Sequence, residues 1–573
     1  MNNSKRIVIC LCMCILNLLY MHFYIIQTCQ VEDVIEWTSW VDNICRICFD
    51  VWVTFSVFLL LTKGHFERSV SITFWITLIW SFSNVLYSRF FFHYLSLSSL
   101  NETKALVDPL VVRSVLAGFR WPDIYFIIIS ISFLFMSFSR MSHTNILFKV
   151  YMKRTFLFGG ILLFIDLMAH VIFCSLDPSL RYYKYLERRV GMRLFGHNHL
   201  LALPIYANFH NGTVKSLIIE TFLEMQGDIE ITDEQKKIIK ETIQKSENSL
   251  VRCNGINIQN TIVILVESYM SFVTDMIVDG KEVTPYLNSL KRDSTVYYNG
   301  KVQSNITMGE SADGQYILMT GMLPLRSMIT VSKAHKKPLP SLVKSLRNIG
   351  INDSRMILPT SSSIWRQDDM CKQYGFTHLY ASNDYCGSHE QTLTDKQVFE
   401  MAINIDRETL SKRFFSIILT ATMHQPYNRI VDHSFVIKDK SLTSEMKSYL
   451  NVCHYTDNCI GTYLESLKSL GLYNNSLIVI TADHHAHHEN FGDNVSSEIP
   501  LFIINGQIGN DAYHGVCNQV DIYTTIIDVL GIKNVWPGLG TSLLNSNYKN
   551  SVTSLKWDVS EFLLLGDFFV NKY

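Results

Sequence analysis

The chain carries almost no net charge, which excludes one broad class of partners. Its 573 residues include 50 lysines and arginines against 51 aspartates and glutamates, so the formal charge at neutral pH is -1. Proteins that attract nucleic acids through a global field need an excess of basic residues. We therefore expect no nucleic-acid partner.

Cysteines in zinc-type spacing are missing from the C-terminal part of the chain. Seven of the 13 cysteines precede residue 180, and Cys10, Cys12 and Cys14 lie in an apolar stretch where they serve most simply as small hydrophobic residues. The other six include no C-x-x-C pair. Because we expect this part to lie outside the cytosol, disulfides are permitted there, with Cys371–Cys386 and Cys453–Cys459 as the nearest candidate pairs among several connectivities.

The sequence contains no internal repeat and no low-complexity tract, but it is rich in apolar residues. Hydrophobic residues make up 48% of the chain and aromatic residues 12%, and the mean hydropathy is positive, which is unusual for a soluble protein. A chain of 573 residues is also too long for one ordinary domain. These properties predict a membrane part joined to a separate domain.

Five apolar stretches in the first third predict a helical transmembrane bundle. A bilayer core requires roughly 20 apolar residues in a helix, and the second and fourth stretches need their flanking residues to reach that length. A cleaved signal peptide is the alternative for the first stretch, but its run ends in bulky residues without a small-residue cleavage site. The stretches are residues 7–27, 47–62, 70–90, 123–139 and 155–176.

Basic residues in the short loops predict the orientation of these spans. Lysine and arginine occur before the first stretch, in the loop 63–69 and in the loop 140–154, whereas residues 28–44 contain acidic residues and neither lysine nor arginine. Basic loops stay on the cytoplasmic side. With the N-terminus inside and five spans, everything after Cys174 lies outside. We therefore expect a multi-pass protein of the cell membrane (inner or plasma) whose C-terminal domain lies outside the cytoplasm.

Two ionisable residues lie within the fifth stretch. Asp166 and His170 are four residues apart and share one helix face. Ionisable groups at membrane depth are costly to bury and often functional. A polar pair that faces neighbouring helices explains them equally well, so both interpretations stay open.

The sequence predicts three regions. Residues 1–176 form the transmembrane domain, residues 177–255 form amphipathic linker helices, and residues 256–573 form the extracytoplasmic catalytic domain. Within the linker, residues 234–247 have helical spacing and mixed charge, and residues 180–210 contain apolar and aromatic residues suited to a membrane interface.

From residue 258 onward, short β-rich runs alternate with helical patterns. This alternation predicts an α/β domain with a mostly parallel central sheet and helices on both faces. The expected strands are 260–266, 355–358, 414–420, 476–482 and 500–504, and the expected helices are 283–291, 339–348, 394–404, 444–468 and 518–530.

Two of the expected strands end at metal-ligand residues. The run NTIVILV ends before Glu267, and the run SLIVITA ends before Asp483 and His484. Reactive groups of open α/β sheets gather outside the carboxyl ends of the strands. Two carboxylates and an imidazole suit Zn²⁺ or Mn²⁺ better than Mg²⁺ or Ca²⁺. We therefore expect one divalent metal, Zn or Mn, at this edge.

Ser311 lies in the polar, glycine-flanked turn NITMGESADGQ, from which a helix can begin. There, backbone donors of the helix N-terminus can bind an anion, and a nearby metal can activate the hydroxyl as a nucleophile. An ordinary helix N-cap serine is the alternative.

Together these features resemble the alkaline phosphatase–sulfatase superfamily. Within it, the chain is most similar to lipoteichoic acid synthase-like and phosphoethanolamine transferase-like membrane phosphotransferases. The likeness covers nearly the whole chain and includes the five spans, VES at 266–268, the G-x-S-x-D turn at 309–313, WRQDDM at 365–370, LTDKQVF at 393–399, FFSIILTATMHQPY at 414–427, TADHH at 481–485, IPLFII at 499–504 and QVDIYTTIIDVLGI at 519–532.

The resemblance implies a sulfatase-like fold and a role for each matching residue. Glu267, Ser311, Asp483 and His484 are expected to bind the metal, with Ser311 as the catalytic nucleophile that becomes phosphorylated. The expected substrate-binding residues are His424, Trp365, Arg366 and His485, to which His487 and His488 are weaker additions because a histidine-rich tract can also be an exposed loop.

Departures from the family pattern bear on the substrate. Relatives specific for glycerol phosphate have an arginine two residues after the tryptophan, where this chain has Gln367 after Trp365. An upstream histidine of that pocket has no counterpart in residues 359–363. The C/S-x-P-x-R motif of true sulfatases is also absent after Ser311, which argues against sulfate-ester hydrolysis.

The resemblance therefore predicts an enzyme, a phosphotransferase of this superfamily. It would move phosphoglycerol or phosphoethanolamine from a membrane phospholipid donor to a cell-envelope glycan or lipid acceptor, through a phospho-serine intermediate. The alternatives are a membrane-anchored phosphodiesterase, phosphatase or sulfatase-like hydrolase, and a non-catalytic membrane scaffold.

Overall fold

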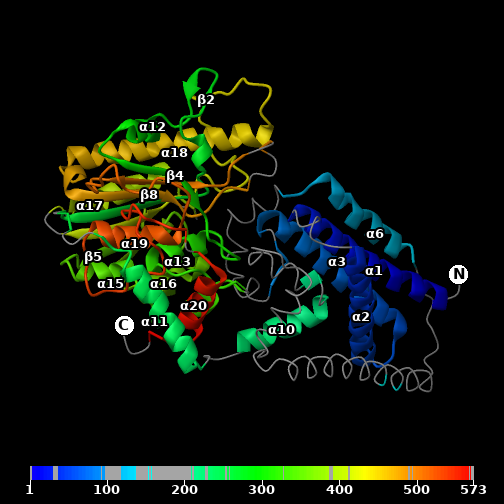
Figure 1. The fold of residues 1–573 in the computed structure, drawn as a ribbon. Coiled ribbons are helices and arrows are strands. Elements are labelled where there is room, and N and C mark those ends of the chain that lie inside the picture. Colours follow the sequence, from blue (N-terminus) through cyan, green and yellow to red (C-terminus); the bar gives the residue numbers. More distant parts are fainter. Residues whose placement is uncertain are drawn as a thin grey trace. The chain divides into compact units, whose positions relative to one another are not determined.

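A computed structural model shows two compact units (Figure 1). The first unit holds the described residues up to Met225, and the second holds those from Glu230 onward. The structure describes residues 3–29, 37–91, 93–96, 118–136, 153, 157, 208–209, 212–225, 230–251, 255–256, 258–326, 328–385, 392–408, 410, 413–487, 491–492, 495–550, 552–566 and 568–569.

The first unit is helical. Three of its helices are long and apolar enough to cross a membrane, over Lys5–Thr28, Asn43–Leu61 and Phe66–Phe91, whereas the apolar segment Trp121–Leu134 is shorter. The five predicted spans are therefore not confirmed as a set, since residues 155–156 and 158–176, with Asp166 and His170, lie outside the described residues. The helices of this unit are α1 Asn3–Thr28, α2 Trp37–Leu61, α3 Phe66–Phe91, η3 Trp121–Asp123, α6 Ile124–Leu134 and α10 Thr213–Met225.

The apolar faces of these helices pack on one another. Cys10 and Cys14 are fully buried, as expected for small hydrophobic residues, whereas Cys12 is exposed. Phe74 of α3 stacks on Phe133 of α6 with ring centroids 3.8 Å apart. These contacts build one core, so the helices form a bundle.

The second unit is built on a sheet of eight strands in the order β10-β4-β9-β8-β1-β7-β5-β6. All neighbouring pairs are parallel except β4–β9 and β8–β9, so the predicted mostly parallel sheet is confirmed. The strands of this sheet are β1 Asn260–Val266, β4 Tyr297–Gln303, β5 Asp353–Ile357, β6 His378–Tyr380, β7 Phe414–Leu419, β8 Ser476–Ala482, β9 Ile499–Ile504 and β10 Cys517–Asn518, and a separate hairpin pairs β2 Ile277–Val278 with β3 Lys281–Glu282.

Helices cover both faces of this sheet. In Figure 1, α12, α17 and α18 lie on one side, and α13, α15, α16 and α19 lie on the other. The bounds are α11 Asp233–Glu247, η5 Ser271–Val273, α12 Pro285–Arg292, α13 Ser311–Thr320, α14 Val331–Ala334, α15 Leu342–Arg347, η6 Ile364–Arg366, α16 Gln367–Tyr374, η7 Ser382–Asp384, α17 Asp395–Glu408, α18 Ser444–Ser469, η8 Tyr473–Asn475, α19 Val520–Val529 and α20 Ser554–Leu565.

Burial on both faces explains the composition of the central strands. Every residue of β1 and of β8 is buried, and both strands consist largely of valine, isoleucine and leucine. A strand with only one buried face would alternate apolar and polar residues. The pairing of these two strands runs in register from Asn260 opposite Ser476 to Val266 opposite Ala482.

The predicted disulfide Cys453–Cys459 is wrong. Both cysteines are buried free thiols on the continuous helix α18. Six residues along a helix correspond to a rise of about 9 Å, which exceeds the roughly 7 Å limit between the Cα atoms of a disulfide. Cys371 is also free, and Cys386 lies outside the described residues.

One buried arginine side chain connects β5 to helix α17. The Arg355 side chain, 1% exposed, lies 3.0 Å from Oδ1 of Asp406 on α17 and 3.1 Å from Oδ2 of Asp353. The guanidinium also stacks over Phe414, and Tyr463 of α18 donates to the other Asp406 oxygen. Burial, opposed by the charge of Arg355, raises the pKa of Asp406 to about 6.

This ion pair predicts a large loss of stability when its acid is removed. Asp406→Ala leaves Arg355 with one carboxylate in a buried site, and we expect unfolding to become easier by about 3 kcal/mol. The matched control is Lys372→Ala, since Lys372 is 74% exposed and 3.5 Å from Asp369, with an expected change below about 1 kcal/mol. Denaturant unfolding of the full chain in detergent measures both, and equal losses would contradict the assignment.

Candidate active site

The pairing of β1 with β8 brings the predicted metal ligands together. The residues that follow these strands are Glu267, Asp483 and His484, and their ligand atoms all lie within 4.8 Å of one another. All three residues are buried, with at most 6% of their surface exposed. The imidazole Nε2 lies 3.4 Å from Glu267 Oε1 and 3.7 Å from Asp483 Oδ2. Residues far apart in the sequence thus converge as expected.

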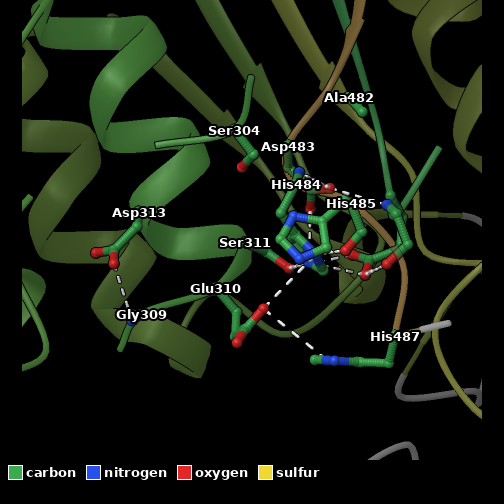
Figure 2. A network of polar contacts seen from close by, with 12 residues as sticks. Ser304, Gly309, Glu310, Ser311, Asp313, Ala482, Asp483, His484, His485 and His487 are labelled. Carbon is green, nitrogen blue, oxygen red and sulfur yellow. Dashed lines mark hydrogen bonds and ion pairs between the residues drawn. The ribbon is translucent and has the colours of Figure 1, made fainter. Parts of the chain in front are cut away.

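Ser311 completes this group (Figure 2). Its Oγ donates to Glu267 Oε2 at 3.2 Å and lies 3.1 Å from His484 Nε2. Ser311 is the first residue of α13, and the N-cap position belongs to Glu310, so the alternative interpretation as an N-cap serine is wrong. The hydroxyl is therefore held by the two ligand side chains.

Three backbone donors at the start of α13 already have acceptors within the turn. The N–H group of Ala312 donates to the Gly309 carbonyl, and those of Asp313 and Gly314 donate to the Glu310 carbonyl. These donors are consumed by the turn itself, so they are not free to bind a phosphate.

The turn before Ser311 is fixed by Asp313. One carboxylate oxygen of this buried residue accepts hydrogen bonds from the Thr307 N–H, the Thr307 hydroxyl and the Gly309 N–H. Glu310 has a φ of 45°, a left-handed value that is uncommon for a residue with a side chain. Strain of this kind occurs often at functional sites, where the surrounding contacts hold it in place.

Gly314 allows α13 to lie directly against the end of β8. A Cβ atom at this position would be 2.0 Å from the carbonyl oxygen of Asp483, which no side chain can occupy. Gln519 donates to the same carbonyl at 2.5 Å, so the backbone of Asp483 is fixed from a second side. Sequence reasoning missed both residues, since neither carries a ligand group.

Hydrogen bonds also fix the loop that follows β1. The Ser268 N–H donates to Asp483 Oδ1 at 2.9 Å, and the Ser268 hydroxyl donates to Glu267 Oε1 at 2.8 Å. The hydroxyl of Tyr449 donates to the Ser268 carbonyl and accepts from the Met270 N–H. Tyr449 lies in the middle of α18, so no local sequence signal identified it.

The imidazole of His484 has a defined orientation. Its Nδ1 lies 2.8 Å from the carbonyl oxygen of His485, and because a carbonyl can only accept, Nδ1 carries the proton in this contact. Nε2 therefore faces Glu267 and Ser311 and is the nitrogen available to a metal at this site. A hydrogen bond on the other nitrogen is typical of histidines that bind metals.

The three ligand residues perturb one another's ionisation. Burial favours a neutral Glu267, but the hydrogen bond and charge of His484 lower the pKa of this carboxyl to about 2. Burial and the negative charge of Glu267 raise the pKa of Asp483 to about 7. Burial opposes a charged His484, yet Asp483 and Glu267 raise its pKa well above the usual value. Without a cation, protons therefore compensate the crowded negative charge.

These donors fit a divalent cation. Two carboxylates, one imidazole and one hydroxyl lie within a single coordination sphere, and this mixture of oxygen and nitrogen suits Zn²⁺ or Mn²⁺.

The other residues predicted to bind substrate lie on separate elements. The charge of His424 contributes to the lowered pKa of Glu267, which places this histidine near the ligands. Trp365 and Arg366 are half-buried in η6 with φ values of 51° each, and neither forms a hydrogen bond or ion pair with Glu267, Ser311 or His484. His485 is half-buried, and His488 lies outside the described residues.

His487 and Glu310 extend the site beyond the predicted residues. His487 Nε2 lies 3.9 Å from Glu310 Oε2, and burial together with the charges of His484, His485 and His424 keeps the pKa of His487 well below its usual value. Burial, partly offset by His484, raises the pKa of Glu310 to about 8. Glu310 was missed because an acid beside a serine is not in itself a metal-site signal.

Metal affinity is expected to fall as the pH drops. Asp483, with a pKa of about 7, and His484, with a raised pKa, must both release protons when a cation binds. We expect Zn²⁺ or Mn²⁺ to bind the chelator-treated full chain roughly tenfold or more weakly at pH 6 than at pH 8. Calorimetric titration at both values tests this, and equal affinities would show that these groups are not the ligands.

Gly314→Ala is expected to disrupt the site without removing any of its ligands. The added methyl group collides with the Asp483 carbonyl, so α13 must move away from β8 and carry Ser311 with it. We expect metal affinity to fall roughly tenfold or more, because ligands displaced by about 1 Å no longer share one sphere. Gly280→Ala is the control, since it meets no atom within 4 Å and adds only the cost of its φ of +77°. Unchanged metal affinity in Gly314→Ala would contradict the contact.

Comparison with known proteins finds a family model and named proteins that are similar to this chain in sequence. Residues 259–532 match the Sulfatase family model. Over 499 residues the chain is 25% identical to the lipoteichoic acid synthase of Staphylococcus aureus (strain NCTC 8325 / PS 47), covering 82% of this chain and 74% of that protein. Over 298 residues it is 27% identical to lipoteichoic acid synthase 2 of Bacillus subtilis (strain 168), but here the match covers 48% of this chain and only 45% of the relative.

A solved structure resembles nearly the whole chain. The integral membrane protein lipooligosaccharide phosphoethanolamine transferase A from Neisseria meningitidis matches 96% of this chain and 99% of its own, with a TM-score of 0.50 and 11% sequence identity. At this identity the likeness shows the fold alone. The match to the Sulfatase family model and the similarity to lipoteichoic acid synthases confirm the expected resemblance, and the chain is an enzyme similar to the membrane phosphotransferases of the alkaline phosphatase–sulfatase superfamily.

Proposed function

We propose that this enzyme transfers the head group of a membrane phospholipid to a hydroxyl group of a cell-envelope glycan or lipid. The observation that carries the proposal is the position of the Ser311 hydroxyl, 3.2 Å from Glu267 Oε2 and 3.1 Å from His484 Nε2. A serine held against ligand residues in this way is placed to act as a nucleophile. The names of the relatives support transfer of a phosphorylated head group.

In the first step, Ser311 Oγ would attack the phosphorus of the donor. The new bond joins this oxygen to phosphorus, the bond from phosphorus to the diacylglycerol oxygen breaks, and the proton lost by Ser311 balances the one gained by diacylglycerol. A divalent cation held by Glu267, Asp483 and His484 would lower the pKa of the hydroxyl and neutralise charge on the phosphoryl oxygens.

In the second step, the bond from the acceptor oxygen to phosphorus would form as the bond from phosphorus to Ser311 Oγ breaks, and the proton lost by the acceptor hydroxyl balances the one regained by Ser311. His487, whose pKa is lowered, remains an uncharged imidazole near neutral pH, so it can take the acceptor's proton. His424, His485, Trp365 and Arg366 are proposed to hold the donor. Three apolar helices long enough to cross a membrane fit a lipid donor, with the catalytic unit on the outer side.

Two other functions make different predictions. A membrane-anchored phosphodiesterase or phosphatase uses the same first step, but water replaces the acceptor hydroxyl. A non-catalytic scaffold has no need of a serine held between two ligand side chains. The ligand geometry therefore favours an enzyme, and the presence of apolar helices favours a lipid substrate over a soluble phosphate ester.

The covalent intermediate gives the direct test. The full chain in lipid vesicles, incubated with phosphatidylglycerol and phosphatidylethanolamine labelled in their head groups, is expected to carry one labelled head group on Ser311, detected by mass spectrometry of its peptide. Ser311→Ala is expected to abolish the label and lower turnover by roughly a thousandfold or more, as for other lost nucleophiles.

The matched control is Ser289→Ala, because this exposed serine donates a hydrogen bond to the Tyr286 carbonyl of its own helix and is expected to leave labelling unchanged. A label that persists in Ser311→Ala would overturn the assigned nucleophile. Release of free head-group phosphate at the same rate with and without a glycan or lipid acceptor would instead favour the hydrolase.

A further inference from the structure

The carboxylate of Glu310 lies at the site without a hydrogen-bond partner among the described residues. Its side chain is only 12% exposed, and its Oε2 lies 3.6 Å from His484 Nδ1 and 3.9 Å from His487 Nε2 (Figure 2). Both distances are longer than a hydrogen bond. A largely buried carboxyl group without hydrogen bonds is costly to ionise, and a partner of opposite charge would lower that cost.

Orientation of His484 does not account for this carboxylate. A carboxylate often accepts the second N–H group of a histidine that binds a metal. In this chain, however, His484 Nδ1 already donates to the His485 carbonyl at 2.8 Å, whereas Glu310 Oε2 lies 3.6 Å from the same nitrogen. Glu310 is therefore available for a different partner.

The charges of the site show what kind of partner is missing. Glu267, Glu310 and Asp483 supply three carboxylates, and no lysine or arginine of the described ranges forms an ion pair with any of them. When all three are ionised, one divalent cation leaves a negative excess, and the phosphodiester of a donor adds to it. Since Glu310 directly precedes the nucleophile, its carboxylate repels the phosphate of any donor, and a neutral head group offers no charge to offset this repulsion.

We propose that Glu310 binds a primary ammonium group in the head group of the donor, so that the enzyme prefers an aminoethyl phosphate donor to a phosphoglycerol donor. This inference rests on the proposed transfer reaction and names its substrate class. His487 lies beside the same carboxylate oxygen and closes that side of the subsite. The ammonium would offset both the buried carboxylate and the phosphate that it brings into the site.

The spacing of the groups agrees with such a head group. Ser311 Oγ contacts Nε2 of His484, and Glu310 Oε2 faces Nδ1 of the same ring, so roughly the width of one imidazole separates the nucleophile from the carboxylate. In an aminoethyl phosphate, one oxygen and two carbons separate phosphorus from nitrogen. The phosphorus can therefore meet Ser311 while the ammonium reaches Glu310. In the transfer, the Ser311 Oγ–P bond forms as the bond from phosphorus to diacylglycerol breaks, and the ammonium remains unchanged.

Competition between two donors tests the inference. Vesicles that contain equal amounts of phosphatidylethanolamine and phosphatidylglycerol, labelled differently, are given to the full chain, and the head group on Ser311 is identified by mass spectrometry. We expect aminoethyl phosphate to exceed phosphoglycerol by roughly tenfold or more. Glu310→Gln keeps the shape of the side chain and removes its charge, and it is expected to lower labelling by phosphatidylethanolamine roughly thirtyfold, with a much smaller change for phosphatidylglycerol.

Glu282→Gln is the matched control. The partly exposed carboxylate of Glu282, on the hairpin of β2 and β3, pairs with Arg292 of α12, and this variant is expected to keep the preference for the aminoethyl phosphate donor. Metal affinity is measured in parallel, and a change of less than about threefold in Glu310→Gln is expected. Loss of metal binding in this variant would show that Glu310 positions His484 or holds a second cation, and would overturn the proposal. Excess phosphoglycerol on Ser311, or equal losses for both donors in Glu310→Gln, would also overturn it. Absence of any head group on Ser311 would instead refute the transfer reaction.

Discussion

The parallel pairing of β1 with β8 is the contact on which the candidate site depends. Val266 lies opposite Ala482, so the next residue of each strand, Glu267 and Asp483, leaves the sheet at the same edge. A shift of this pairing by one residue would turn one of the two carboxylates to the other face of the sheet. The ligand geometry is therefore a consequence of strand register, which the fully buried valine and isoleucine residues on both strands enforce.

Helix α13 adds the nucleophile to this edge, and its position depends on close backbone contact. Gly314 brings the first turn of the helix against the Asp483 carbonyl, and Asp313 fixes the turn that precedes it. Ser311 thus reaches Glu267 and His484 because a residue without a side chain follows it by one helical turn. The strained backbone at Glu310 belongs to the same arrangement and turns a third carboxylate toward the histidines.

Much of this could be predicted from the sequence, because the signals were local. The runs that precede Glu267 and Asp483 are continuous and apolar, and the observed strands β1 and β8 have the predicted bounds. By contrast, β4 was missed because YYNGKVQ contains a glycine and polar residues, and its pairing with β9 is interrupted by a bulge. Tyr449 and Gln519 were missed for another reason: their roles depend on which helix packs on which loop, and spacing along the chain carries no such information. The predicted Cys453–Cys459 bridge ignored the helix that contains both residues.

The claim that unites these features is that one cation binds Glu267, Asp483 and His484 with the Ser311 oxygen beside it. Crystals of the full chain soaked with Mn²⁺ or Zn²⁺, with diffraction recorded at the absorption edge of the metal, locate the ion directly. The account predicts a single strong anomalous peak within about 2.0–2.3 Å of one atom from each of the three side chains and in contact with Ser311 Oγ. A peak elsewhere in the catalytic unit, or a bound ion that Ser311 does not approach, would contradict it.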